Sequence, residues 1–301
     1  MDGIIAVNKP SGMTSHDVVF RLRKILQMKK IGHAGTLDPS VDGVLPVALG
    51  RATKTIEFLQ NSGKVYTGEI IFGFSTETED LDGEVVERKP LSNPFDTATI
   101  TTAMEQMTGE ITQIPPMYSA VKVNGRRLYQ YARAGETVER PERQVMIYDF
   151  EMTNDPSFDL SAGTQTFTFT ARVSKGTYIR TLAVDLGKHL GVPAVMSRLT
   201  RVEAGGFKLE QAHSLEEIAA QPVEKIMEII YPLDYALNEL PHVELTHAQW
   251  VEVKDGKGLS AEEMPYQSDQ LVYVYDGEVK SVVAWNQDKN QYRPYRTFKI
   301  H

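Results

Sequence analysis

The chain has 301 residues, of which 41% are hydrophobic and 24% are charged, and its formal net charge at pH 7 is −8. This length allows two domains with a well-formed core, and the composition is typical of a soluble globular protein. The absence of cysteine excludes disulfides, thiolate zinc sites, iron–sulfur clusters and cysteine nucleophiles. The acidic excess lies from Glu203 onward, so the net charge argues only weakly against a nucleic-acid partner.

The sequence also bears on the compartment of the protein. It has no run of about 18 apolar residues, and its first residues lack a basic segment followed by an apolar one. We therefore expect neither a membrane span nor a signal peptide. Together with the lack of cysteine, this predicts a cytoplasmic protein.

The N-terminal segment predicts a strand followed by a helix. Residues 3–7 are apolar and have the length of a short buried strand. A polar turn follows, and Thr14 or Ser15 can cap a helix over about 16–27. Basic residues lie on and after this helix, between Arg21 and Lys30, where they form either a solvated face or a phosphate-binding one.

A glycine-rich loop over 32–43 precedes the apolar strand predicted at 44–49, and it contains His33, Asp38 and Asp42. Glycines let the backbone adopt positive φ and let a ligand approach closely. The pair Asp38-Pro39 cannot continue a helix. A loop of this composition is more often a simple turn than a functional site, so a functional role needs support from other parts of the sequence.

Two alternating strands and one helix are predicted in the middle of the chain. Apolar residues recur at every second position from Tyr66 to Phe74 and again over 166–173. A Gly turn then leads into a helix over 178–190, whose first turn contains Arg180. A cation at a helix N-terminus is unfavourable, so we expect an anionic side chain beside Arg180.

The segment 117–143 predicts a basic flap. An Asn-Gly pair at 124–125 indicates a tight hairpin, and a short helix follows it. Basic residues interleaved with tyrosines are what a surface that follows an RNA backbone needs, although a mobile flap without a ligand explains them equally well. The candidate phosphate contacts are Lys122, Arg126 and Arg127.

The C-terminal residues differ in character from the rest. Short β-rich segments follow Pro241, the last of them over 292–299, and Asp276-Gly277 between two of them indicates a hairpin. We therefore expect two domains, a larger one over 1–237 and a small β-barrel-like module over 238–301.

Five separate motifs resemble those of the bacterial TruB family of tRNA pseudouridine-55 synthases, in the family's order and over about residues 4–201. They are Asn8-Lys9-Pro10 with Gly12, the loop Gly32 to Pro39, Lys64-Val65-Tyr66, Pro115-Pro116 with Tyr118 to Lys122, and Ser174 to Leu182. Glu77 and Asp42 depart from the family's pattern, which puts fine substrate contacts in doubt but not the reaction. The last sixty residues resemble the family's PUA-like module only loosely.

The resemblance implies an α+β fold, with a mixed, largely antiparallel central sheet flanked by helices and a small C-terminal β-rich module. It implies isomerisation of uridine 55 in the T-loop of tRNA after the base is flipped out. Asp38 is then the nucleophile, attacking C1′ of the ribose or C6 of the base, and Arg180 keeps it ionised. Tyr66 is expected to stack on the base and to remove the C5 proton.

The resemblance also implies the surrounding contacts. His33 would fill the space that the flipped base leaves, Tyr178 and Leu199 would line the uridine pocket, and Asp80 would lie near it. Lys9 would support the catalytic loop. We expect no cofactor and no metal, a monomer, and the tRNA T-arm as partner.

Two other hypotheses are weighed against this one. The first is a non-catalytic protein that binds or folds tRNA in the same cleft. The second is a metal hydrolase built from His33, Asp38 and Asp42, although their spacing is not a familiar ligand pattern.

Overall fold

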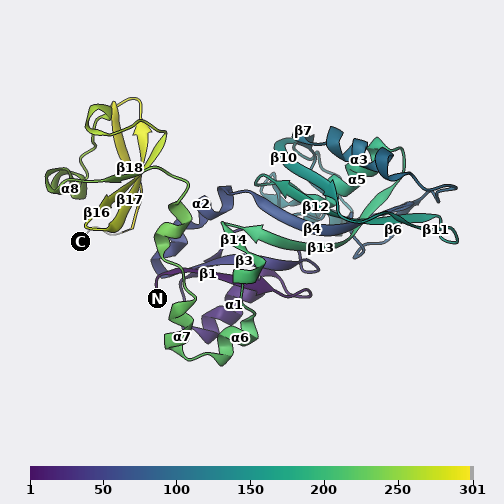
Figure 1. Cartoon of the computed structure of the whole chain (residues 1–301), viewed down its shortest axis with the longest axis horizontal. Helices are drawn as coiled ribbons and strands as arrows, with labels where there is room; N and C mark the ends of the chain where they lie inside the picture. Colours follow the sequence, from purple (N-terminus) through teal and green to yellow (C-terminus); the bar gives the residue numbers. More distant parts are fainter. Residues whose placement is uncertain (299–301) are drawn as a thin grey trace.

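The computed structural model describes residues 1–298, which form two lobes built on separate sheets (Figure 1). The larger lobe contains a ten-stranded sheet with helices on both of its faces. The smaller lobe contains a four-stranded sheet near the C-terminus. The expected α+β class, with a mixed sheet and a β-rich C-terminal part, is confirmed.

The large sheet has the strand order β1-β3-β13-β4-β12-β10-β7, and all of its pairs are antiparallel except β3 with β13. Short strands β2, β11 and β14 pair beside this path. The strands are β1 (Gly3–Lys9), β2 (Ile31–His33), β3 (Asp42–Leu49), β4 (Lys64–Phe72), β7 (Gly109–Gln113), β10 (Arg143–Met152), β11 (Ser157–Asp159), β12 (Thr164–Val173), β13 (Ala194–Ala204) and β14 (Phe207–Lys208).

Helices cover the two ends of this sheet on opposite faces (Figure 1). Helices α3 (Thr97–Gln106) and α5 (Ile179–His189) pack over β10 and β12, whereas α1 (Ser15–Ile25), α6 (Leu215–Ala220) and α7 (Val223–Glu228) lie under β1 and β3. Thr14 caps α1 by accepting a hydrogen bond from the Asp17 backbone N–H, as predicted. Between β3 and β4 lie a 3₁₀ turn (Gly50–Thr55) and α2 (Ile56–Asn61).

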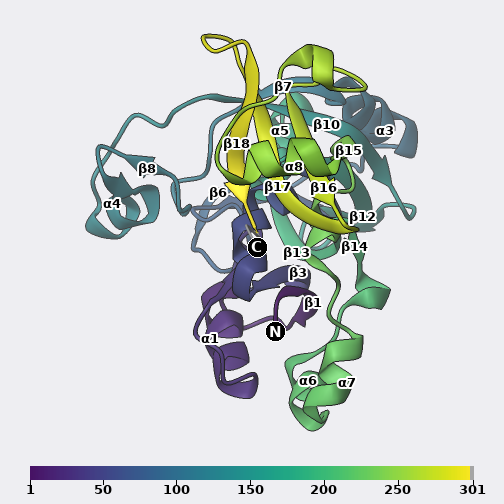
Figure 2. The same ribbon diagram turned by 90° about the vertical axis from the view of Figure 1, so that its left-hand side faces the viewer.

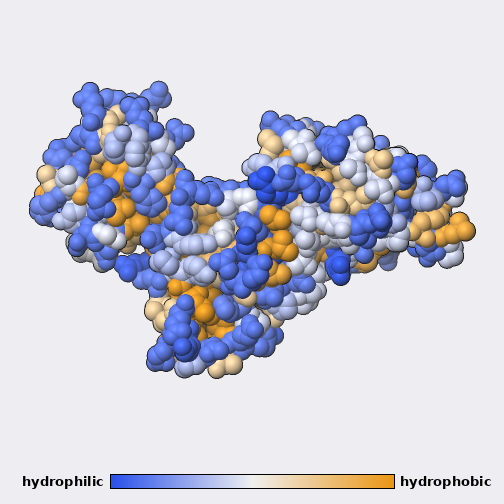
Figure 3. Space-filling view, in the orientation of Figure 1, coloured by the Kyte–Doolittle hydropathy of each residue, from blue (hydrophilic) through white to orange (hydrophobic). Residues whose placement is uncertain are grey.

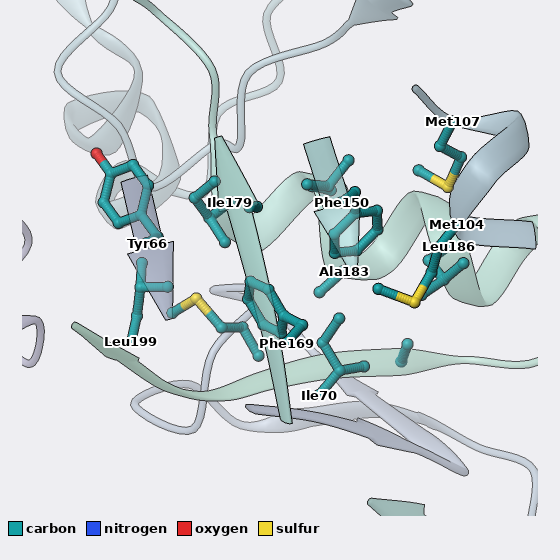
Figure 4. Close-up of a cluster of buried hydrophobic side chains, with 14 of the residues drawn as sticks. Tyr66, Ile70, Met104, Met107, Phe150, Phe169, Ile179, Ala183, Leu186 and Leu199 are labelled. Atoms are coloured by element: carbon teal, nitrogen blue, oxygen red, sulfur yellow. The ribbon is translucent and has the colours of Figure 1, made fainter. Parts of the chain in front are cut away.

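The core forms because β4 and β12 alternate strictly between buried and partly exposed residues. Phe167, Phe169 and Ala171 of β12 are fully buried, and the tyrosine of β4, Tyr66, is almost fully buried. The ring of Phe169 packs edge-on against Phe150, with centroids 5.6 Å apart. Figure 4 shows Tyr66 and Leu199 at the end of this cluster, away from the methionines of α3.

The sequence did not predict β13, although it is a central strand of the sheet. Its register shifts twice against β4, between Met196 and Arg198 and between Arg201 and Glu203. A bulge adds a residue to one strand, so the alternation of apolar and polar residues loses its period of two. The strand therefore has no clean pattern in the sequence. Gly43 of β3 lies beside it so closely that a Cβ would approach the Arg201 carbonyl oxygen to 2.2 Å.

The flap of residues 117–143 projects away from the body of the large lobe (Figure 2). It contains the predicted hairpin of β8 (Lys122–Val123) and β9 (Arg126–Arg127), whose turn residues Asn124 and Gly125 both have positive φ. Helix α4 (Leu128–Ala134) follows and ends at Gly135 in the left-handed conformation. A second hairpin of β5 (Phe74–Thr76) and β6 (Val85–Arg88) extends β4.

The small lobe begins its sheet at His242. Its strands are β15 (His242–Glu244), β16 (Gln270–Tyr275), β17 (Glu278–Asn286) and β18 (Gln291–Thr297), with α8 (His247–Lys254) packed against them. Asp276 and Gly277 form the predicted turn with positive φ. The strand predicted over 292–299 ends at Thr297 in the structure, and Lys299 lies outside the described residues.

The two lobes meet where α2 touches β18, beneath the notch that separates them in the space-filling view (Figure 3). Tyr295 donates a hydrogen bond to Glu57 Oε2 at 2.7 Å and packs edge-on against Phe58. Arg296 forms an ion pair with the same glutamate. Lys54 of the preceding 3₁₀ turn adds a hydrogen bond to the Thr297 carbonyl oxygen, so β18 contacts both short elements between β3 and β4.

Truncation of Phe169 tests the core. Phe169→Ala removes a fully buried ring and its partner contact, so we expect the free energy of unfolding to fall by about 3–5 kcal/mol. Urea unfolding followed by circular dichroism measures it. The control is Leu160→Ala, because Leu160 is 77% exposed and its truncation should change stability by less than about 0.5 kcal/mol. Equal losses in both variants would contradict the core assignment.

Candidate active site

The glycine-rich loop is held in place by the N-terminal turn. Lys9 is fully buried, and its Nζ donates hydrogen bonds to the carbonyl oxygens of Pro10, Met13 and Pro39. The buried Ser15 hydroxyl bonds the backbone of Leu37, accepting from its N–H at 2.9 Å and donating to its carbonyl at 3.2 Å. Asp38 therefore lies between two anchored neighbours, Leu37 and Pro39.

Arg180 is the anchor of the Asp38 side chain. Its Nη2 lies 2.8 Å from Asp38 Oδ2, and its side chain is 5% exposed whereas that of Asp38 is 41% exposed. Its Nε lies 3.6 Å from Asp80 Oδ2. The anion expected beside this cation is thus Asp38, with Asp80 as a second partner. The charge is buried only because two carboxylates neutralise it.

Arg180 also donates to two backbone carbonyls, those of Thr78 at 2.7 Å and Tyr118 at 3.0 Å. These carbonyls belong to the acidic loop after β5 and to the base of the flap. Burial raises the pKa of Asp80, and the hydrogen bond from Thr78 and the charge of Arg180 oppose that rise. One guanidinium therefore connects three segments that are far apart in the sequence.

A cavity of about 260 Å³ brings the predicted catalytic residues together. Asp38, Tyr66 and Arg180 all line it, and so do Tyr178 and Leu199. Tyr66, Leu199 and Ile179 lie side by side at the end of the core cluster, with the Tyr66 hydroxyl pointing away from the cluster (Figure 4). The cavity thus combines an apolar wall with one carboxylate held by an arginine, and it leaves room for a planar ring.

The other predicted residues lie outside this cavity. His33 lies at the end of β2, opposite Val47 of β3, and burial together with the charge of Arg201 lowers its pKa. Lys9 lies beneath the loop and Asp80 lies behind Arg180. The predicted residues of the flap are exposed. Arg126 pairs with Glu136 at 2.8 Å and lies over the Tyr131 ring. Arg127 lies over the Tyr129 ring, and Lys122 is in the hairpin.

Three site residues were not predicted from the sequence. Gln113, fully buried at the end of β7, clamps the backbone of Tyr178: its Oε1 accepts from the Tyr178 N–H at 2.9 Å and its Nε2 donates to the Tyr178 carbonyl. Lys64 and Arg201 are buried cations that line the cavity. Lys64 belongs to the motif Lys64-Val65-Tyr66, in which the sequence indicates a role only for Tyr66. Arg201 was missed because nothing in the sequence marks a buried arginine on an unpredicted strand.

Two kinds of feature are absent from the described residues, a cluster of metal ligands and a long apolar helix. No set of three histidine, aspartate or glutamate side chains within residues 1–298 is placed to bind a metal ion. No helix in the same part of the chain combines the length and apolar character needed to cross a membrane.

The fold and the cavity define a pseudouridine synthase. Over 99% of this chain and 85% of the other, the structure superimposes with a TM-score of 0.75, at 27% sequence identity, on a chain of the solved structure described as "Crystal Structure of a Cbf5-Nop10-Gar1 Complex". Residues 23–179 match the model of the TruB family pseudouridylate synthase N-terminal domain. Residues 180–238 match that of the tRNA pseudouridylate synthase B C-terminal domain.

The chain belongs to the TruB family of pseudouridylate synthases. It is 52% identical, over the full length of both chains, to the tRNA pseudouridine synthase B of Levilactobacillus brevis. It is 54% identical to the protein of the same name from Lacticaseibacillus paracasei, over 98% of this chain and 96% of the other. The family resemblance drawn from the sequence is confirmed.

The buried lysine of the cavity has a measurable consequence for stability. Burial lowers the pKa of Lys64 to about 8 from the ordinary 10.5, because desolvation disfavours the charged amine and Arg201 and Lys175 repel it. Between about pH 8 and pH 10 the unfolded chain binds this proton more tightly, so stability contributed by Lys64 rises with pH in that window. From about pH 8 to about pH 10, the free energy of unfolding of the wild type minus that of Lys64→Met should therefore increase by about 1–2 kcal/mol.

Urea unfolding at several pH values in this window measures the difference. Subtracting the Lys64→Met curve removes the contributions of the other titrating groups. The matched control is Lys188→Met, whose amine is largely exposed and whose curve should stay parallel to that of the wild type. A wild-type curve that also runs parallel to that of Lys64→Met would contradict the lowered pKa.

Proposed function

We propose that this protein isomerises uridine 55 in the T-loop of tRNA to pseudouridine, with Asp38 as the nucleophile. The observation that carries the proposal is the ion pair of Asp38 with the buried Arg180 at the wall of a cavity that Tyr66 also lines. The names of the relatives, tRNA pseudouridine synthase B, support tRNA as the substrate.

The reaction is an isomerisation, so no group donor and no redox partner enter it. The bond between C1′ and N1 of uracil breaks, the base rotates, and a bond from C1′ to C5 forms. The proton on C5 leaves, and N1 ends with a proton. Asp38 acts as a nucleophile either at C1′ or at C6, and the geometry of the pair serves both routes.

Arg180 holds the attacking carboxylate in position. The guanidinium holds one carboxylate oxygen of Asp38, and that partly exposed side chain lines the cavity. Because Thr78 and Tyr118 fix the guanidinium through their carbonyl groups, Asp38 does not have to be ordered again when the substrate binds.

Tyr66 supplies an aromatic surface for the base, and its hydroxyl is the candidate acceptor of the C5 proton. Leu199 and Ile179 extend the apolar wall beside its ring. Tyr178 also lines the cavity, and Gln113 holds its backbone. A uracil ring between these groups is removed from water, which strengthens the electrostatic effect of Arg180.

The uridine has to leave its stack to enter this cavity, at a cost of a few kcal/mol. Stacking on an aromatic side chain returns about 1–3 kcal/mol, so one tyrosine roughly offsets the flip. We infer that most of the affinity comes from phosphate contacts of the flap residues Lys122, Arg126 and Arg127 and of the basic segment around α1. His33, at the start of the glycine-rich loop, would fill the space left by the base.

We infer that the protein binds the T-arm as a monomer and acts in the cytoplasm, where the cysteine-free chain needs no oxidising environment. The C-terminal module, which we propose to be PUA-like, is placed by α2 beside the large lobe.

The nucleophile is tested with Asp38→Asn. The amide cannot act as an ionised nucleophile, so pseudouridine formation in an unmodified T-arm stem-loop should fall by about 10³-fold or more, whereas the affinity for the RNA should change little. Chemical mapping of pseudouridine gives the rate and filter binding gives the affinity.

Asp42→Asn is the matched control, because it makes the same change in the second carboxylate of the loop, which lies outside the cavity. Its rate should stay within a few-fold of the wild type. Undiminished product from Asp38→Asn would end the assignment of the nucleophile. A wild-type protein that binds the stem-loop but forms no pseudouridine would instead support the non-catalytic tRNA-binding hypothesis.

Tyr66 is tested with two substitutions that separate its roles. Tyr66→Phe keeps the ring but removes the hydroxyl, so turnover should fall by about 10²-fold or more while binding stays near the wild-type value. Tyr66→Leu removes the stacking surface too, so binding should also weaken, by about tenfold. Full activity of Tyr66→Phe would show that another group removes the C5 proton.

A further inference from the structure

Two cations of the cavity are buried without a carboxylate partner. Arg201 is 1% exposed, and its hydrogen bonds go to the carbonyl oxygens of Val44 and Gly35. Lys64 is 7% exposed, and its Nζ donates to the carbonyl oxygens of Gln60 and Ser62. Within residues 1–298 neither forms an ion pair.

Such burial opposes folding. A charge taken out of water without a counter-charge lowers stability, and an apolar side chain in the same place would often be more favourable. Carbonyl groups satisfy part of the hydrogen-bonding capacity of each cation, but they leave its charge uncompensated. The arrangement is therefore suited to an anion that arrives from outside the chain.

A guanidinium nitrogen of Arg201 and the terminal methylene of Lys64 approach the same spot, beside Gly35, while the Lys64 ammonium bonds the carbonyl oxygens of Gln60 and Ser62. A Cβ built on Gly35 would lie 3.4 Å from Arg201 Nη1 and 3.8 Å from Lys64 Cε, and the backbone of Gly35 has φ +98°. Arg201 Nη1 makes no hydrogen bond to any residue in the described part of the chain. A glycine without a side chain, next to a guanidinium nitrogen that has no partner and with a lysine close by, leaves a space that a phosphate oxygen can enter.

The charges of the residues that line the cavity also favour an anionic ligand. Arg180 pairs with Asp38, the single carboxylate of the lining, and with Asp80 behind it. Lys64 and Arg201 remain uncompensated, and Lys175 stands with them in the lining, where its Nζ bonds Asn61 Oδ1 at 3.0 Å. The cavity is thus strongly positive in a chain whose overall charge is negative.

We infer that Gly35, Lys64 and Arg201 form a subsite for a phosphodiester group of the RNA, one that flanks the flipped uridine. This inference rests on the proposed function, because a nucleotide that enters the cavity brings its own phosphates with it. Arg201 binds an oxygen through its free Nη1, and Lys64 adds a point charge. Binding the phosphate holds the flipped nucleotide in the cavity, in addition to the contacts made to its base.

The test removes the charge from the RNA and from the protein separately. T-arm stem-loops are prepared with one methylphosphonate at a time in the linkages flanking the target uridine, and dissociation constants are measured with Asp38→Asn so that no turnover occurs. We expect the methylphosphonate at one of these linkages to weaken binding by about tenfold, because the cations of the subsite then lose their charged hydrogen-bonding partner. Lys64→Met, made in the same background, should lose about as much with natural RNA.

The combination decides the outcome. When the methylphosphonate at that linkage meets Lys64→Met, the loss should not increase, since both changes remove one interaction. The matched control is Lys188→Met, which removes an exposed lysine of α5 and should leave the methylphosphonate effect at its full size. Arg201→Lys, which keeps the charge, serves as a second variant and should lose less than Arg201→Met.

Three results would overturn the inference. The first is that no linkage beside the uridine is sensitive to the methylphosphonate. The second is that the methylphosphonate weakens binding by Lys64→Met as much as it weakens binding by Lys188→Met, and the third is that the natural stem-loop does not bind. Pseudouridine formation by the wild-type protein on natural RNA is followed in parallel. Its presence with any of the first two results rejects the subsite alone, whereas its absence rejects the proposed function.

Discussion

The ion pair between Asp38 and Arg180 is the interaction on which the rest of the site depends. Arg180 lies at the start of α5, where the helix dipole disfavours a cation, and it is nearly fully buried. It is stable there because it meets Asp38 and Asp80 and the carbonyl groups of Thr78 and Tyr118. The same requirement assembles the active site, since those four residues come from the catalytic loop, the acidic loop and the base of the flap.

A second constraint is the rigidity of the catalytic loop. Its backbone is held by Lys9 and Ser15 from the N-terminal turn, and Gly43 allows its strand to approach β13 within a distance that no side chain permits. The backbone that carries Asp38 is therefore oriented by the chain itself. These anchoring contacts are made to backbone carbonyl and N–H groups, so they set the path of the loop without using the carboxylate itself.

The distribution of charge reconciles an acidic protein with a polyanionic substrate. The net charge of −8 comes from the C-terminal third, whereas the cavity is lined by more cations than anions. Over a distance of about 10 Å at ordinary ionic strength, screening makes the local charges more important than the sum. Buried cations are affected least by screening, which is why Lys64 and Arg201 can act on a phosphate even in salt.

The sequence by itself determined the elements with strong local signals: the alternating strands β4 and β12, the cap of α1 at Thr14, and the turns at Asn124-Gly125 and Asp276-Gly277. It also determined the family, because five short motifs keep their order, and through the family it indicated Asp38, Tyr66 and Arg180. Only the tertiary structure decided which side chains meet. The sequence did not predict β13 because its two bulges erase the alternation of apolar and polar residues. The burial of Arg201 beside Gly35 could therefore not be predicted either. The environment of Lys64 and the clamp of Gln113 on Tyr178 were hidden for the same reason: each depends on pairing between segments that are distant in the chain, and such pairing leaves no local pattern.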